Sequence, residues 1–137
     1  MNQDKTIIFE KFAQQAARRL EERKKFRKEQ LKITSMEDMV IEIRGLTDKE
    51  INDCYEFSEN PLEIDRYTIY CASSTLQEMA RILVADGKLK QGQEYTITEM
   101  FTSVERNFIT KRILELSGVT GNAGVEVVKE TEEIKNF

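Results

Sequence analysis

Residues 4–32 contain neither glycine nor proline, and this stretch constrains the fold more than any other feature of the chain. It consists mainly of Ala, Gln, Glu, Lys, Arg and Leu, which all have high helix propensity. Ile8, Phe12 and Leu20 are spaced by multiples of four residues, which places them on one face of a helix. Phe9 borders that face. The pattern predicts a long amphipathic helix at the start of the chain.

The apolar stripe of this helix stops at Leu20, and residues 21–29 are almost all charged. A helix with so little to bury is stable chiefly when another element packs on its apolar half. Three interpretations stay open for the arm. It is a docking or oligomerisation helix, a solvated arm with no partner, or an arm that binds nucleic acid or a membrane surface. For the first, the partner-binding residues are Ile8, Phe9, Phe12 and Leu20.

The charge of the chain changes sign near Thr34 and Ser35. Residues 1–35 hold ten Lys or Arg and five Asp or Glu, a net charge of +5. Residues 36–137 hold eleven and twenty, a net charge of −9. Such an asymmetry marks a boundary. We therefore predict a basic amphipathic helical arm over 1–35, a helical core domain over 36–118, and a glycine-containing loop with an acidic tail over 119–137.

The expected fold class is mainly α, a small multi-helix domain with at most a short strand near 39–43. Thr47 and Glu50 have the spacing of a capping box, which predicts a helix from there to about residue 57. Asn60 before Pro61 predicts a second helix start, because proline suits the first helical position. The polar residues 73–75 can break or bend the helix that follows.

The last long helix is expected to run from about Ile97 to Leu116, with Gly118 as its C-terminal cap. Its apolar residues lie on two faces, so it either kinks near Asn107 or is buried on two sides. Residues 102–119 could also be the second half of a helix-turn-helix motif, with Arg106, Lys111 and Arg112 directed at phosphates. The acidic body has the wrong sign for a long-range attraction to DNA.

The residue types exclude much chemistry. The chain has no histidine, which excludes Ser-His-Asp and Cys-His nucleophile systems and histidine-ligated metal sites. Cys54 and Cys71 match no zinc spacing, and we interpret them as reduced structural thiols. Asp53 and Glu56 are expected to raise the pKa of Cys54. No catalytic, cofactor-binding or metal-ligating residue is assigned, no apolar run is long enough to span a bilayer, and the chain is not expected to be an enzyme.

Several segments nevertheless form a pattern in their order and spacing. The leucine-serine-glycine ending of the long helix and the acidic, valine-rich tail are its most specific parts. The matching segments are residues 43–51, 65–70, 94–101, 113–118, 125–130 and 133–136. Over roughly residues 39–135 the chain resembles the XkdN-type tail assembly chaperones of phages and prophages of Gram-positive bacteria.

The resemblance implies a small helical protein of the host cytoplasm that is absent from the mature virion. Such chaperones bind the long tape measure protein and help tail tube subunits polymerise around it, and they have no catalytic motif. The implied partners are the tape measure protein and the tail tube protein, with a homo-oligomer also open and no cofactor. Two other classes remain: a small helical adaptor or regulator, which could bind nucleic acid through the basic arm, and a structural tail component.

Overall fold

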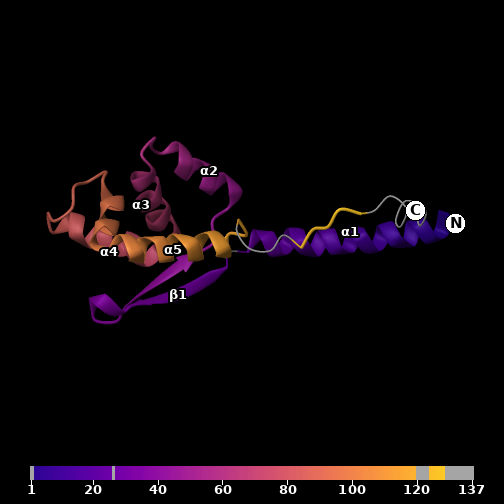
Figure 1. Ribbon diagram of the computed structural model, residues 1–137, viewed down its shortest axis with the longest axis horizontal. Coiled ribbons are helices and arrows are strands. Elements are labelled where there is room, and N and C mark those ends of the chain that lie inside the picture. Colours follow the sequence, from indigo (N-terminus) through magenta and orange to yellow (C-terminus); the bar gives the residue numbers. More distant parts are fainter. Residues whose placement is uncertain (1, 26, 120–123, 129–137) are drawn as a thin grey trace. The chain divides into compact units, whose positions relative to one another are not determined.

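The computed structural model describes residues 2–25, 27–119 and 124–128, with side chains from residue 4 onward. Contacts divide the chain into two units. The first contains helix α1 (Asn2–Lys24), and the second spans residues 26–121 and is called the body below (Figure 1). The described chain is mainly helical, with one two-stranded sheet, which confirms the predicted fold class.

Helix α1 is shorter than the sequence predicts, because it ends at Lys24 instead of residue 32. Residues 28–33, assigned above to the helical arm, form strand β1 (Lys28–Ile33) of the body. Leu31 and Ile33 are buried while the residue between them is exposed, which is the alternation of a half-buried strand. Pairing and burial outweigh the helix propensity of the lysine, glutamate and glutamine in this segment.

The partner of β1 is β2 (Met39–Arg44), which was predicted as a short strand near 39–43. The two strands are antiparallel, with Leu31 opposite Ile41 and Ile33 opposite Met39. A 3-10 turn, η1 (Thr34–Met36), begins the connection. Glu37 and Asp38 complete it in the left-handed region, at φ 54° and 60°. The expectation of at most one strand was therefore wrong.

All four described α-helices of the body begin at polar caps, and three of these caps follow one another along the chain. Helix α2 (Asp48–Glu56) has the predicted capping box, because Thr47 Oγ1 accepts from Glu50 N at 3.1 Å and Glu50 Oε1 accepts from Thr47 N at 3.0 Å. Helix α3 (Pro61–Ala72) begins after Asn60, as predicted. Ser73 follows the last residue of α3, and its side chain caps the start of helix α4 (Ser74–Ala85).

The predicted helix from 97 to 116 is two elements. A 3-10 segment, η2 (Glu94–Met100), ends before Phe101, and α5 (Ser103–Leu116) begins after Thr102. Thr102 and Glu105 form a second capping box, which fixes this start. The helical path is therefore interrupted near residue 101 and not near Asn107. The C-terminal cap is confirmed, with Gly118 at φ 77° and its N–H donating to Glu115 O at 3.1 Å.

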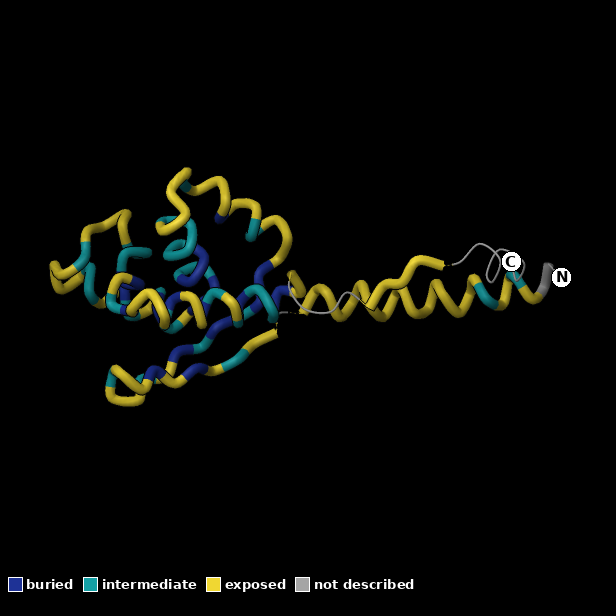
Figure 2. Tube along the Cα trace, viewed as in Figure 1, coloured by how far each residue is buried: buried dark blue, intermediate teal, exposed yellow. Residues whose placement is uncertain are grey.

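The core of the body lies where one face of the hairpin meets α3, α4 and α5. In Figure 1 the hairpin lies below α5, and α2 and α3 lie above it. Figure 2 shows the buried positions concentrated on β2, α3 and α5. The most deeply buried large side chains are Ile41, Ile43, Ile69, Leu76, Ile109 and Ile113. Of the predicted tail, residues 124–128 have no regular secondary structure, and 120–123 and 129–137 lie outside the described residues.

Candidate functional site

The four residues predicted to bind a partner all lie on α1. Phe9, Phe12 and Leu20 are exposed to 56%, 47% and 64%, and Ile8 is half-buried. Phe9, Phe12 and Ala16 follow one another at spacings of three and four residues, so they share a helix face. Leu20 extends this face by one further turn. We call Ile8, Phe9, Phe12, Ala16 and Leu20 the α1 stripe.

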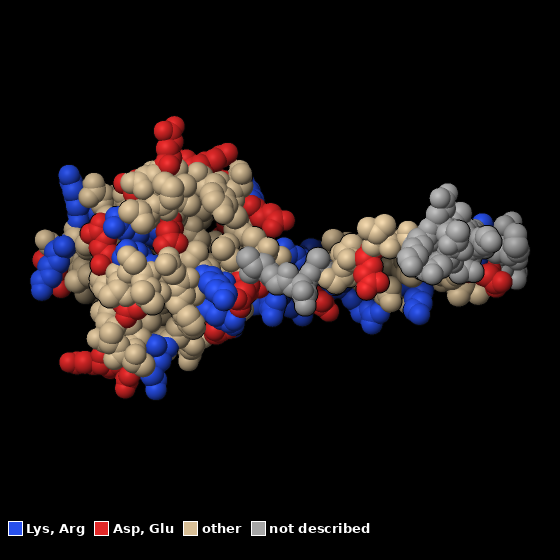
Figure 3. All heavy atoms as spheres, viewed as in Figure 1, with Lys and Arg blue, Asp and Glu red and all other residues tan. Residues whose placement is uncertain are grey.

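The rest of α1 is strongly charged. Residues 2–25 contain seven Lys or Arg and four Asp or Glu, a net charge of +3. Figure 3 shows blue and red side chains alternating with tan surface along this helix. A helix with a cationic polar face and an exposed apolar stripe is an amphipathic element of the kind that docks on a partner.

The body has an apolar groove where α2, α3 and α5 meet. Its volume is about 290 Å³. Ile51 and Tyr55 of α2 are one helical turn apart and form one wall. The other walls come from the first turns of α3 and the second half of α5. The complete lining is Ile51, Tyr55, Pro61, Ile64, Asp65, Thr68, Thr110 and Leu114.

One hydrogen bond links two walls of the groove. The Thr110 hydroxyl donates to the carboxylate of Asp65, which joins α5 to α3. Ile51 and Leu114 are only partly buried, and Tyr55 is 60% exposed. The groove therefore presents apolar surface together with one carboxylate that is already hydrogen-bonded.

The segment of the chain that forms α2 and the start of α3 is acidic. Residues 48–65 contain seven Asp or Glu and one Lys, a net charge of −6. In Figure 3 red side chains gather over the α2 side of the body. The α5 wall is less charged, and Lys111 is the cation next to the lining residue Thr110. The groove is thus lined mainly by apolar side chains, and the segment that supplies two of its walls carries a net negative charge.

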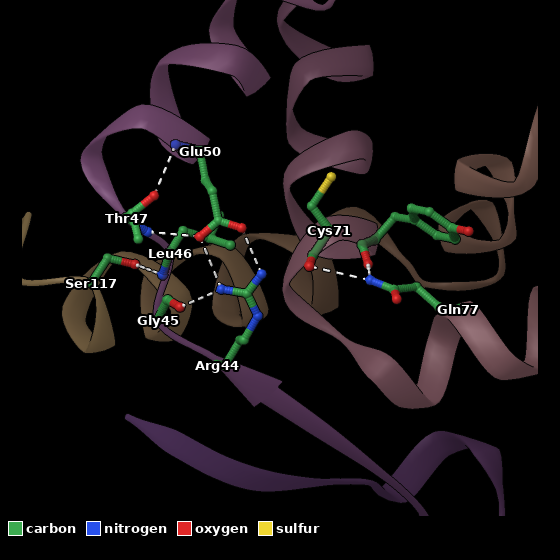
Figure 4. A network of polar contacts seen from close by, with 9 residues as sticks. Arg44, Gly45, Leu46, Thr47, Glu50, Cys71, Gln77 and Ser117 are labelled. Carbon is green, nitrogen blue, oxygen red and sulfur yellow. Dashed lines mark hydrogen bonds and ion pairs between the residues drawn. The ribbon is translucent and has the colours of Figure 1, made fainter. Parts of the chain in front are cut away.

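The start of α2, beside this groove, is fixed by a polar junction (Figure 4). Arg44 donates to both carboxylate oxygens of Glu50, at 3.0 and 2.6 Å. This hydrogen bond lowers the pKa of Glu50 to about 2, against the opposing effect of burial. Leu46 N donates to Ser117 Oγ at 2.8 Å, which joins the same segment to the end of α5. The hairpin, α2 and α5 therefore meet in one hydrogen-bonded corner.

The two cysteines are neighbours in the core between α2 and α3, and both are free thiols. A hydrogen bond from the Cys71 thiol lowers the pKa of Cys54 to about 7. The same contact raises the pKa of Cys71. The charge of Asp53 raises the pKa of Cys54, as expected, but the thiol–thiol contact outweighs it, so the net shift is downward; Glu56 is not among the causes.

Two of the three cations proposed for a helix-turn-helix are engaged within the body. Arg106 is buried and its guanidinium donates to the Phe101 carbonyl. Arg112 pairs with Glu29 and with Glu115. Lys111 remains exposed. Two of the three cations of α5 therefore make contacts within the body and are not available to bind phosphates.

Helix α5 also has a side that the core does not use. Ile109, Ile113 and Leu116 are buried, so they belong to the core. Val104 and Phe108 are exposed to 79% and 58% on the opposite side of α5. These two residues form a small second apolar patch.

The sequence reasoning missed the groove. The sequence feature that best indicates the groove is the acidic run over 48–65, which surrounds the pair Ile51 and Tyr55. The capping box alone does not explain this run. That α3 and α5 complete the groove follows only from the packing, because Asp65 and Thr110 are 45 residues apart.

Comparison with protein-family models, with curated proteins and with solved structures gives no match to this chain. Among the described residues, no group of three or more acidic or cysteine side chains is placed to hold a metal ion. None of the described helices has both the length and the apolarity needed to cross a membrane.

Proposed function

We propose that this chain is a phage or prophage tail assembly chaperone that binds the tape measure protein through the α1 stripe. It does so in the host cytoplasm, without catalysis, and leaves before the virion is complete. The observation that carries the proposal is the exposure of Phe9, Phe12 and Leu20 on a charged helix. The particular client rests on the resemblance over residues 39–135.

The physical argument concerns what a chaperone must do for a long helical client. An amphipathic helix offers apolar side chains at spacings of three and four residues, which is how one helix recognises another or a groove. The flanking lysines, arginines and glutamates keep such a complex in solution. Phe9 and Phe12 supply aromatic area, which contributes much of the binding free energy in many interfaces.

The test is co-expression of this chain with the tape measure protein of the same phage or prophage. We expect the client to become soluble and to co-purify. The complex should persist at ~0.5 M salt, because apolar contacts are not screened whereas exposed ion pairs are. Substitution of Phe12 and Leu20 by Asp should abolish co-purification while the body keeps its thermal unfolding transition.

The matched control is Ile82→Asp, which places the same charge on α4 at a residue that is 55% exposed. This variant should bind the client normally. A tape measure protein that stays insoluble with the wild-type chain would refute the chaperone function. Recovery of the chain from purified, washed virions would instead favour a structural tail component.

A second candidate is an adaptor that binds nucleic acid through α1, and the net charge of +3 over residues 2–25 favours it. Retention on immobilised DNA at low salt, lost steeply as salt rises, would support this function. Substituting Arg18 and Arg19 by Gln should then reduce retention, whereas Leu20→Asp should change it little. The opposite ranking is expected for the chaperone.

A further inference from the structure

The groove between α2, α3 and α5 has the form of a helix-binding site. Its base is apolar, and its 290 Å³ can take large side chains of a docking segment. Ile51, Ile64 and Leu114 come from three different helices, so the base is built by the packing of the body and is not a feature of one element. Thr110 and Asp65 satisfy each other at its edge.

The net charge of the segments that form the groove favours one sign of charge in its occupant. The segment 48–65, which supplies two walls, has a net charge of −6, and α5 (Ser103–Leu116) contributes a net charge of only +1. Glu50 is neutralised by Arg44 and Asp65 is bonded to Thr110. Glu56 and Glu59 are exposed, and they follow the lining residue Tyr55 and precede the lining residue Pro61 in the sequence. A cationic occupant is favoured because opposite potentials attract across an interface.

Helix α1 has the complementary chemistry. Its stripe provides Phe9, Phe12 and Ala16 at spacings of three and four residues, the pattern of a helix that lies in an apolar groove. Ala16 is small, which permits close approach between backbones. Arg19 lies eleven residues after Ile8, about three helical turns, so this cation borders the stripe. The net charge of +3 over residues 2–25 opposes the −6 of the groove walls.

We propose that the groove binds α1 of a second copy of this chain, so that two copies form a dimer with two equivalent contacts. Each copy then offers its helix to the groove of the other, as two-fold symmetry requires. The apolar stripe is covered in this dimer until a client displaces it. The dimer itself does not depend on the proposed chaperone function.

The experiment is sedimentation of the full chain over a range of concentrations at low salt. We expect reversible dimers for the wild type. Tyr55→Asp, at an exposed lining residue, and Leu20→Asp, on the stripe, should each give monomers. Ile82→Asp, at a residue of similar exposure on α4, should still give dimers. Circular dichroism and thermal unfolding verify that all three variants are folded.

Mixing the two monomeric variants tests whether the α1 helix of one copy binds the groove of the other. The Leu20→Asp chain keeps an intact groove, and the Tyr55→Asp chain keeps an intact helix. An equal mixture should therefore form heterodimers through one remaining contact, although neither variant dimerises alone.

Charge reversal provides a test that does not depend on Tyr55. Glu56→Lys with Glu59→Lys should weaken the dimer, and adding Arg19→Glu to the same chain should restore part of it.

Three results would overturn the proposal. The first is a wild-type chain that stays monomeric at every concentration, including the case in which α1 occupies the groove of its own chain. The second is a dimer that Leu20→Asp disrupts and Tyr55→Asp does not, which would place two α1 helices against each other. The third is a mixture of the two variants that stays monomeric. Failure of the client experiment would leave these outcomes unchanged.

Discussion

The guanidinium of Arg44 donates to both carboxylate oxygens of Glu50, and Glu50 also accepts from the backbone of Thr47. The Glu50 carboxylate therefore joins the end of the hairpin to α2 and also completes the cap of that helix. Ion pairs of this bidentate geometry are stronger than single contacts. The side chains of Arg44 and Glu50 are 26% and 33% exposed, so water screens this pair only in part.

Acid should destabilise the chain through Glu50. The pKa of Glu50 is about 2 in the folded chain, against an ordinary value of 4.5, so its contribution to stability is complete above 4.5 and is lost as the pH falls toward 2. We expect Glu50→Gln to remove about 1–2 kcal/mol of stability at neutral pH, after allowance for solvent screening. Urea unfolding at several pH values measures this.

The control for Glu50 is Glu78→Gln, because Glu78 pairs with Arg81 on an exposed face of α4. This substitution should change stability by only a few tenths of a kcal/mol. A Glu50→Gln chain that loses stability between pH 4.5 and 2 as steeply as the wild type would contradict the assignment.

Gly45 should tolerate no side chain. A Cβ at this position would lie 2.5 Å from the carbonyl oxygen of Leu116, a backbone atom that cannot move alone. We expect Gly45→Ala to lower the free energy of unfolding by about 3 kcal/mol, the upper range for overpacking. Gly87→Ala is the comparison, because nothing lies near its Cβ and only its positive φ of 72° opposes alanine, at about 1 kcal/mol. Equal losses at both glycines would contradict the steric argument.

The thiol pair should titrate as a unit. Denatured, non-reduced protein should contain two free thiols per chain, because both cysteines are reduced.

In the folded chain we expect thiolate absorbance to appear near pH 7, where Cys54 ionises because Cys71 donates a hydrogen bond to it. Cys71→Ala should move this midpoint upward, toward the ordinary pKa of 9.0. A midpoint that does not respond to Cys71→Ala would exclude the hydrogen bond as its cause.

Stability should follow the same ionisation. The folded pKa of Cys54 lies below its ordinary value, so its contribution to stability should rise between pH 7 and 9 and be lost as the pH falls through 7. Tyr67 acts in the opposite direction at higher pH, because contact with Cys71 raises its pKa from 10.0 to about 12. Cys71, whose pKa is raised from its ordinary value of 9.0, acts in the same direction as Tyr67, so stability should fall again above pH 9.

Limited trypsin digestion should separate α1 from the body. Cleavage is expected after Lys24, Lys25 and Arg27, leaving a resistant fragment that begins no later than Lys28, the first residue of β1. Lys28 and Lys32 lie in the strand ladder, where hydrogen bonds to β2 protect the backbone. Mass spectrometry of the fragments locates the cuts. A stable fragment that begins after Lys32 would contradict the place of β1 in the body.

Local signals in the sequence were sufficient to place most helix starts. Thr47 with Glu50 and Asn60 before Pro61 form caps from residues only a few positions apart, so each start depends on its own neighbours. Gly118 ended α5 for the same reason. The capping box of Thr102 and Glu105 was equally local, but the apolar residues on both sides of it favoured one continuous helix. The absence of histidine also limited the available chemistry without any structure.

Tertiary structure decided what depends on residues far apart in the chain. Residues 28–33 favour helix by composition, and they form a strand because residues 39–44 offer hydrogen bonds and a buried face. The lowered pKa of Cys54 depends on Cys71 from another helix, and the groove depends on Asp65 meeting Thr110. A local cap is stabilised within one turn, whereas pairing, burial and the shape of a groove gain their free energy only when distant segments pack together.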